Sequence, residues 1–293
     1  MNIRRLRYFV AVADQLHFGR AAKKLHMAQP PLSQQIRKLE KELDLELFER
    51  NTRSVNLTEA GNALLGQARR LLATADSVER FLDDFRAGDR GTLRLGFVDS
   101  SAYEVMPRFL REYRQRWPEA DFELRSLSSD QQCDALIGGD IDLGIGRTMG
   151  DGADVEATPI LREKLFVAVP SSHRLAEASS VRLSRLEGES FIGFDQAVSP
   201  TLHAELVGMF AGVGVGYRPI IEATEYTSIL GLVAAGEGVA VVPAGVRSFQ
   251  PAELRYVKVS DAAAVVRLTM LRRRGENVRL VERGLDLATE LFG

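Results

Sequence analysis

The sequence predicts an α+β multidomain chain, with a winged helix-turn-helix and a long linker helix preceding a two-lobed α/β region. Apolar residues first recur at helical spacing in three short stretches. A 3-4 alternation of apolar residues then runs from Leu64 to Phe85. From Thr92 onward, short apolar strands alternate with helices. We therefore expect domains at 1–58, 59–90 and 91–293, the last with lobes of about 91–162 plus 268–293, and 163–267.

The composition indicates a soluble protein of the reducing cytosol. The 293 residues are 45% hydrophobic and 27% charged, which is ordinary for a globular chain. The single cysteine, Cys133, cannot form an internal disulfide. Asp14 and Gln15 interrupt the first apolar stretch, so we expect a helix there rather than a signal peptide. No apolar run approaches about 18 residues, so we expect a cytoplasmic chain without a membrane partner.

The first 58 residues predict three helices and a hairpin. The helices are expected at about 3–16, 18–26 and 30–43, and two strands at 45–50 and 55–57 around a polar loop. In the third helix, apolar residues at 32, 36, 39 and 43 face inward and leave a Ser/Gln/Arg/Lys face outside. Such a face is typical of a DNA recognition helix. Residues 1–58 have a net charge of +5 and the remainder −7, which suits a polyanion-binding head, although a solvated basic face is the alternative.

The next segment predicts a coiled-coil helix from about 58 to 87. Its apolar seam consists of Leu64, Ala68, Leu71, Ala75, Val78, Leu82 and Phe85. This spacing favours a dimerisation surface, and packing against the chain's own body is the alternative. A hinge is expected at 88–91, where two glycines flank Asp89-Arg90.

The remaining sequence predicts a mainly parallel α/β arrangement with a cleft. Strands are expected at 93–98, 122–127, 143–146, 165–169, 191–194, 219–222 and 239–242, and helices at about 102–116, 129–138, 200–211 and 227–235. Several helix starts carry hydroxyl groups: Ser100-Ser101, Ser128-Ser129, Ser199-Pro200 and Thr227. Helix starts that face one cleft would form an anion-binding pocket. The alternative is that each hydroxyl only caps its helix, as Ser101 with Glu104 would in a capping box.

Enzyme chemistry finds little support in the sequence. The four histidines, at 17, 26, 173 and 203, lack a metal-ligand spacing. The glycines of 144–150 miss the dinucleotide-binding spacing by one residue. We therefore expect neither a metal nor a cofactor, and no enzyme. A solute-binding or metabolite-sensing protein without promoter function remains the other alternative.

The chain as a whole closely resembles the LysR-type transcriptional regulators, and within them the aromatic-catabolism subgroup. The residues that carry the resemblance are Arg7-Tyr8-Phe9, Ala21-Ala22, Leu25, Gln29-Pro30, Leu32-Ser33, Ile36, Leu39-Glu40, Leu47–Arg50, Leu57–Gly61, Leu232–Val239 and Val242-Pro243. The resemblance implies a periplasmic-binding-protein-like sensor domain and a homotetramer assembled from dimers. It also implies promoter DNA, a small-molecule effector and RNA polymerase as partners.

The resemblance also implies two sets of site residues. The DNA contacts would be Gln29, Pro30, Pro31, Ser33, Gln34, Arg37, Lys38 and, in the wing, Arg53. The effector contacts would be Asp99, Ser100, Ser101, Ser128, Ser129, Arg147, Phe194, Pro200, Thr201 and Thr227.

Two positions depart from the pattern of the family. Many relatives carry arginine where this chain has Gln34, and those sensing aromatic acids often carry glycine where it has Asp99. Asp99 could repel an acidic ligand. We nevertheless expect a carboxylate effector, because two helix starts and Arg147 oppose that single charge.

Overall fold

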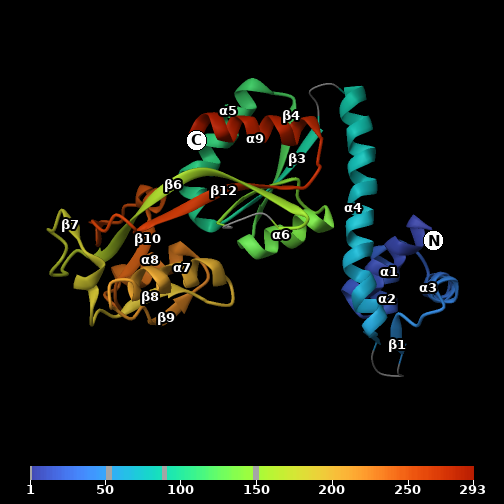
Figure 1. The fold of residues 1–293 in the computed structure, drawn as a ribbon, viewed down its shortest axis with the longest axis horizontal. Helices are drawn as coiled ribbons and strands as arrows, with labels where there is room; N and C mark the ends of the chain where they lie inside the picture. The colour runs from blue at the N-terminus through green and yellow to red at the C-terminus, as the bar shows by residue number, and fades with distance from the viewer. Residues whose placement is uncertain (1, 51–54, 88–90, 148–151) are drawn as a thin grey trace. The chain divides into compact units, whose positions relative to one another are not determined.

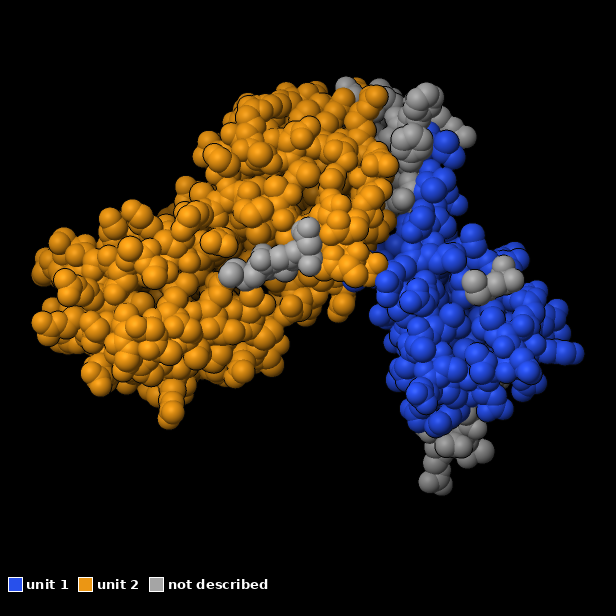
Figure 2. Space-filling model, in the orientation of Figure 1, with its two compact units in different colours: residues 1–83, 137–139 blue, residues 84–136, 140–293 orange. Residues whose placement is uncertain are grey.

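The computed structural model describes residues 2–50, 55–87, 91–147 and 152–293. The chain forms two compact units, one of residues 1–83 with 137–139 and one containing the rest (Figure 2).

The N-terminal unit confirms the predicted helices and hairpin (Figure 1). It contains α1 (Ile3–Gln15), α2 (Phe18–Lys24), α3 (Gln29–Leu43), β1 (Phe48–Arg50), β2 (Val55–Leu57) and α4 (Glu59–Ala87). The two strands pair antiparallel. Leu32, Ile36 and Leu39 are completely buried on the inner face of α3, against Phe9 of α1 and Leu47 before the hairpin. This continuous core fixes the orientation of α3.

The hairpin and α4 are joined by polar contacts that explain the local sequence. The Glu40 carboxylate accepts from the backbone N–H groups of Leu47 and Phe48, at 3.1 and 3.3 Å. Thr58 caps α4, because its hydroxyl donates to the Glu46 carbonyl and accepts from the Gly61 N–H at 2.9 Å. A methyl group at Gly61 would overlap the Leu47 carbonyl oxygen, so glycine is required for this close approach.

The apolar seam of α4 is buried near the start of the helix and exposed farther along it. Near its start, the seam residues Leu64 and Ala68 pack on the core of the unit, together with Leu65 and Leu72 beside the seam. Farther on, Leu71, Val78 and Leu82 are 38%, 54% and 47% exposed. Of the predicted seam, the side chain of Phe85 lies outside the described ones. The first two seam residues are therefore packed within the unit, and from Leu71 onward the seam leaves large apolar side chains uncovered.

The C-terminal unit is built on one eight-stranded sheet and a separate pair of strands (Figure 1). The strands of the large sheet follow the order β4-β3-β5-β12-β6-β11-β7, and β10 also pairs with β6. Their bounds are β3 (Gly91–Phe97), β4 (Ala120–Ser126), β5 (Leu143–Gly146), β6 (Val155–Pro170), β7 (Ser180–Val181), β10 (Ala240–Pro243), β11 (Leu254–Val259) and β12 (Val265–Arg273). The separate parallel pair is β8 (Phe191–Phe194) with β9 (Pro219–Ala223).

Among its described residues, this unit also contains five helices and three 3-10 turns. The helices are α5 (Val105–Arg116), α6 (Ser129–Gly138), α7 (Pro200–Ala211), α8 (Tyr226–Ala234) and α9 (Arg279–Phe292). The turns are η1 (Asp99–Tyr103), η2 (Leu183–Leu186) and η3 (Ala244–Ser248). Among the described residues, no helix combines the length and the apolar character needed to cross a bilayer.

Two long strands, β6 and β12, run through both lobes of the unit. They pair antiparallel, and their register shifts between Leu268 and Thr269. One apolar core, including Leu143, Ile160 and Leu268, lies in the first lobe. Two more, one including Leu165 and Val266 and the other including Phe166 and Ile192, lie in the second lobe. The prediction of a mainly parallel sheet was wrong for the centre, because one strand leaves the first lobe and the other returns, so the two run in opposite directions.

Candidate functional site

The outer face of α3 carries most of the predicted DNA-contacting residues. Gln29, Pro30, Pro31, Gln34, Arg37 and Lys38 are exposed, and Ser33 is half-buried. Pro30 and Pro31 lie in the first turn of the helix, where a missing N–H costs no intrahelical bond. The predicted wing residue Arg53 lies outside the described residues.

A contact from α1 holds this face in place. The Arg5 guanidinium forms an ion pair with Glu42 near the end of α3 and donates to the Gln35 amide oxygen at 3.2 Å. In the turn before α2, the His17 ring nitrogen accepts from the N–H groups of Gly19 and Arg20. In the turn before α3, His26 adopts a left-handed conformation with φ of 51°. The result is a polar helix face on a fixed support.

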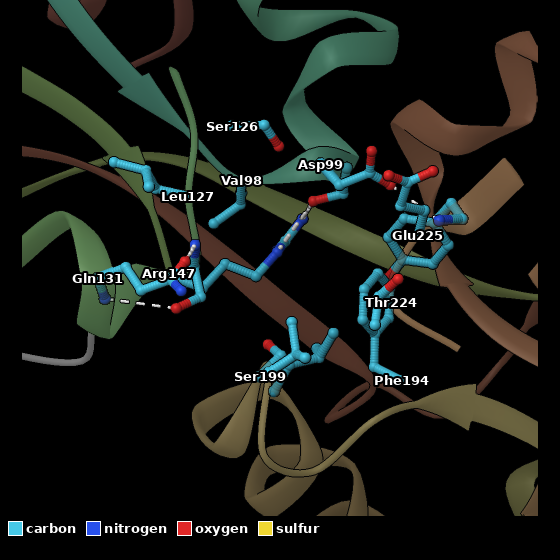
Figure 3. A pocket seen from close by; sticks show the side chains of 15 residues that line it. Val98, Asp99, Ser126, Leu127, Gln131, Arg147, Phe194, Ser199, Thr224 and Glu225 are labelled. Carbon is cyan, nitrogen blue, oxygen red and sulfur yellow. Dashed lines mark hydrogen bonds between the residues drawn. The ribbon is translucent and has the colours of Figure 1, made fainter. Parts of the chain in front are cut away.

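A cavity of about 180 Å³ lies between the lobes of the C-terminal unit (Figure 3). The first lobe supplies the ends of β3, β4 and β5, and the second supplies β8, the start of α7 and the start of α8. The lining residues are Val98, Asp99, Ser100, Ser126, Leu127, Ser128, Gln131, Arg147, Phe194, Val198, Ser199, Leu202, Thr224, Glu225 and Tyr226. The cavity therefore lies at strand-to-helix turns, where open α/β sheets bind ligands.

Half of the predicted effector contacts line this cavity. They are Asp99, Ser100, Ser128, Arg147 and Phe194, whereas Ser101, Ser129, Pro200, Thr201 and Thr227 are not among the lining residues. The residues that the sequence reasoning missed include Ser126, Gln131, Thr224, Glu225 and Tyr226. Each of these adjoins a predicted strand end or helix start, so the turns themselves were the available signal.

Ser101 and Ser129, which do not line the cavity, form hydrogen bonds within the protein instead. The Ser101 hydroxyl donates to the Val98 carbonyl at 2.8 Å, and the Ser129 hydroxyl accepts from the Arg147 N–H at 2.8 Å. The predicted capping box of Ser101 with Glu104 was wrong, because η1 occupies 99–103 and α5 begins only at Val105. Thr227 lies one residue inside α8 and is exposed, because this helix begins at Tyr226.

The positive charge of Arg147 is matched within the protein. Its Nη2 donates to the Glu163 carboxylate at 2.7 Å and to the Ser100 hydroxyl at 2.8 Å. The side chains of Arg147 and Glu163 are only 3% and 4% exposed. Glu163 also accepts from the Gly245 N–H at 3.3 Å. Arg147 therefore lines the cavity and is at the same time one partner of a buried ion pair.

Asp99 connects the first lobe to the start of α8. Its Oδ2 accepts from the backbone N–H of Tyr226 at 2.9 Å. Burial raises the pKa of the Asp99 carboxyl, the nearby Glu225 raises it further, and the hydrogen bond from Tyr226 opposes both. Among the described residues, no group of three or more His, Cys, Asp or Glu side chains could hold a metal ion.

Comparison with known proteins matches most of the chain to one family. Residues 3–62 match the bacterial regulatory helix-turn-helix proteins of the lysR family, and residues 86–293 match the LysR substrate binding domain. The HTH-type transcriptional regulator AlsR of Bacillus subtilis (strain 168) is 35% identical over 261 residues, covering 89% of this chain and 86% of AlsR.

Two solved structures are similar to the chain. Full-length CbnR complexed with its target DNA has a TM-score of 0.73 and 28% identity, covering 99% of each chain. The effector binding domain of BenM with its effector benzoate has a TM-score of 0.63 and 31% identity, covering 68% of this chain and 91% of that domain. The relatives are transcriptional regulators, which decides against the enzyme alternative. The family resemblance is confirmed, and the chain belongs to the LysR family of DNA-binding transcriptional regulators that respond to small-molecule effectors.

Proposed function

We propose that this regulator reads promoter DNA with the outer face of α3 and that a small molecule bound between the lobes of the C-terminal unit changes its hold on the promoter. The observation that carries the proposal is the two-sidedness of α3, whose inner stripe is completely buried and whose outer face is polar and exposed. The CbnR complex with target DNA supports a DNA partner for a chain of this architecture.

The chemistry of the α3 face suits the major groove. The Gln34 amide can bond an adenine edge with both of its polar atoms, and Arg37 can contact guanine or a phosphate. Pro30 offers an apolar surface to a thymine methyl group. Arg37 and Lys38 form no ion pair within the described part of the chain, so neither charge is committed elsewhere. We assign Gln29, Pro31 and Ser33 to the same interface, and Arg53 to the wing contact.

We propose a homodimer formed through the uncovered half of α4, and a homotetramer assembled from two such dimers. Leu71, Val78 and Leu82 supply the apolar surface for the dimer. The protein would act in the cytoplasm, with RNA polymerase as a further partner. The predicted lobe boundaries fit this scheme, because the apolar cores of the C-terminal unit divide at β6 and β12, with one core in the first lobe and two in the second.

A DNA-binding titration tests the α3 assignment. The full chain is titrated against DNA from upstream of its gene by fluorescence anisotropy, together with the variants Gln34→Ala and Arg37→Ala. Each should weaken binding by about 1–3 kcal/mol, or roughly 5- to 150-fold. The matched control is Gln250→Ala, an exposed glutamine of the C-terminal unit that should bind as wild type. If both α3 variants bind the DNA as tightly as wild type, the assignment of the α3 face to DNA contact is refuted.

A further inference from the structure

We propose that the interlobe pocket selects a neutral or cationic effector rather than a carboxylate, because the protein's own Asp99 already occupies the start of α8. This inference rests on the proposed function, since it concerns the ligand of the same pocket. It also competes with the carboxylate expected from the helix starts and Arg147.

The first argument is the position of Asp99. A helix start attracts anions because its first N–H groups lack intrahelical acceptors. At α8 the first of these groups, the Tyr226 N–H, donates to the Asp99 carboxylate at 2.9 Å. Asp99 comes from η1 of the other lobe, 127 residues earlier in the chain. A ligand carboxylate at this N–H group would have to displace the internal acceptor, and anywhere at the start of α8 it would lie near the charge of Asp99.

The second argument is the balance of charge around the cavity. Asp99 and Glu225 both line it, and Figure 3 shows the two side chains next to each other at the start of α8. Arg147 is the only cationic lining residue, and the pocket consists entirely of described residues. Its guanidinium is paired with Glu163 at 2.7 Å, on side chains that are nearly inaccessible to solvent. Two carboxylates therefore face the ligand, and the one cation is already neutralised.

The third argument is the aromatic surface on the second lobe. Phe194 and Tyr226 line the cavity with their ring centroids 4.7 Å apart at an angle of 74°. Aromatic faces attract cations and accept flat rings. A cavity of roughly 150 Å³ in another protein accepts benzene, so this one, at about 180 Å³, suits a compact ligand. The structure thus favours a small flat group that bears hydrogen-bond donors or a positive charge.

Three probes that share one ring but differ in charge test the inference. Benzamidine is cationic, benzamide is neutral, and benzoate is the effector of the related BenM domain. Each is titrated calorimetrically into the full-length protein at neutral pH. We expect benzamidine and benzamide to bind at least tenfold more tightly than benzoate.

Two substitutions at the start of α8 locate the source of this preference. Asp99→Asn should weaken benzamidine and strengthen benzoate, each by about tenfold, because an amide retains an acceptor for the Tyr226 N–H but carries no charge. Glu225→Gln, at an exposed position, should also lower the affinity for benzamidine relative to that for benzoate. This variant provides the test if Asp99→Asn fails to fold. The matched control is Asp121→Asn on exposed β4, which should leave all three affinities unchanged.

Three results would overturn the inference. Benzoate could bind wild type as tightly as benzamidine, the folded Asp99 and Glu225 variants could keep the wild-type ratio, or none of the probes could bind up to its solubility limit. The same preparations are titrated with upstream DNA in parallel. If wild type does not bind the upstream DNA, the proposed function itself is refuted. If wild type binds the DNA but does not prefer benzamidine and benzamide over benzoate, only the charge selection is refuted.

Discussion

Replacing Glu163 with glutamine should destabilise the C-terminal unit strongly, although the change removes only a charge. The carboxylate faces two donors, Arg147 Nη2 at 2.7 Å and the Gly245 N–H at 3.3 Å. A glutamine can turn its oxygen toward one of them, and its NH₂ group then faces the other donor. The guanidinium also loses its counter-charge at a site where the arginine side chain is 3% exposed.

The expected cost is on the order of 3 kcal/mol, the lower end for breaking a buried ion pair by removing one partner. For a unit of this size, such a loss lowers the melting temperature by about 6–12 °C. The single tryptophan, Trp117, lies at the end of α5 and packs on Tyr113 with ring centroids 4.6 Å apart. Its fluorescence therefore reports the unfolding of this unit without interference from the N-terminal one.

The control for this prediction is Glu290→Gln on α9, which removes the surface ion pair with Arg116. Both of its side chains are well exposed, so we expect little change in melting temperature. A second check is the double variant Arg147→Met with Glu163→Leu, which removes both charges and should recover much of the lost stability. If Glu163→Gln melts at the same temperature as Glu290→Gln, the reasoning about this buried pair is refuted.

Three further predictions concern α4 and Asp99. Gly61→Ala should destabilise the N-terminal unit by about 1–3 kcal/mol through overlap with a backbone carbonyl of the hairpin. A methyl group at Gly66 on the same helix meets nothing within 4 Å, so Gly66→Ala should stabilise the unit by about 0.5–1 kcal/mol. In calorimetry the two variants should shift the melting temperature in opposite directions, and shifts in the same direction would contradict the packing described. Leu71→Glu with Val78→Glu should give monomers in light scattering, and an unchanged oligomer would exclude this surface as the dimer contact. Asp99 should reduce stability as pH rises from its ordinary pKa of 3.8 through the raised folded value, because burial and then the neighbouring glutamate disfavour its charged form. Urea titrations at a series of pH values should therefore show the unfolding free energy of Asp99→Asn increasing relative to that of wild type as pH rises. A difference in unfolding free energy that stays constant with pH would argue against this role.

The N-terminal unit could be predicted almost completely because its signals are local. The stripe of Leu32, Ile36 and Leu39 follows the helical period, and the two prolines mark the start of α3. Thr58 marks the start of α4 in the same way. What the sequence could not show is how the α4 seam divides, because only the fold determines that Ala68 is buried and Val78 exposed.

The C-terminal unit was harder to predict where strands are long or charged. The first half of β6 was missed because Pro159 and polar neighbours interrupt its apolar pattern. In β12, Arg267, Arg272 and Arg273 hide a strand that is otherwise buried. The helix α9 was also missed, although its apolar spacing from Leu280 to Ala288 contained a usable signal.

The chemistry of the pocket could be predicted only in part for a related reason. Strand-to-helix turns indicated where the cavity lies and led to Ser100 and Ser128, whereas Arg147 was implied by the family resemblance. Pairings between distant residues leave no local pattern, so the sequence concealed both that Glu163 neutralises Arg147 and that Asp99 accepts from α8. These two contacts are the ones on which the proposed charge preference rests.

The joint between the hairpin and α4 has a consequence for the spacing of DNA half-sites. Thr58 and Gly61 fasten the start of α4 to the segment that leads into β1, so the DNA-reading head and this helix turn as one body. In a dimer built on α4, the phase between two recognition helices is then set by the angle at which each head leaves its helix. One residue inserted after Asp76, beyond the α4 positions that pack on or pair with the head, would rotate the head by about 100° around the α4 axis relative to Val78 and Leu82. Such an insertion should change which operator spacing is bound while leaving each half-site sequence readable.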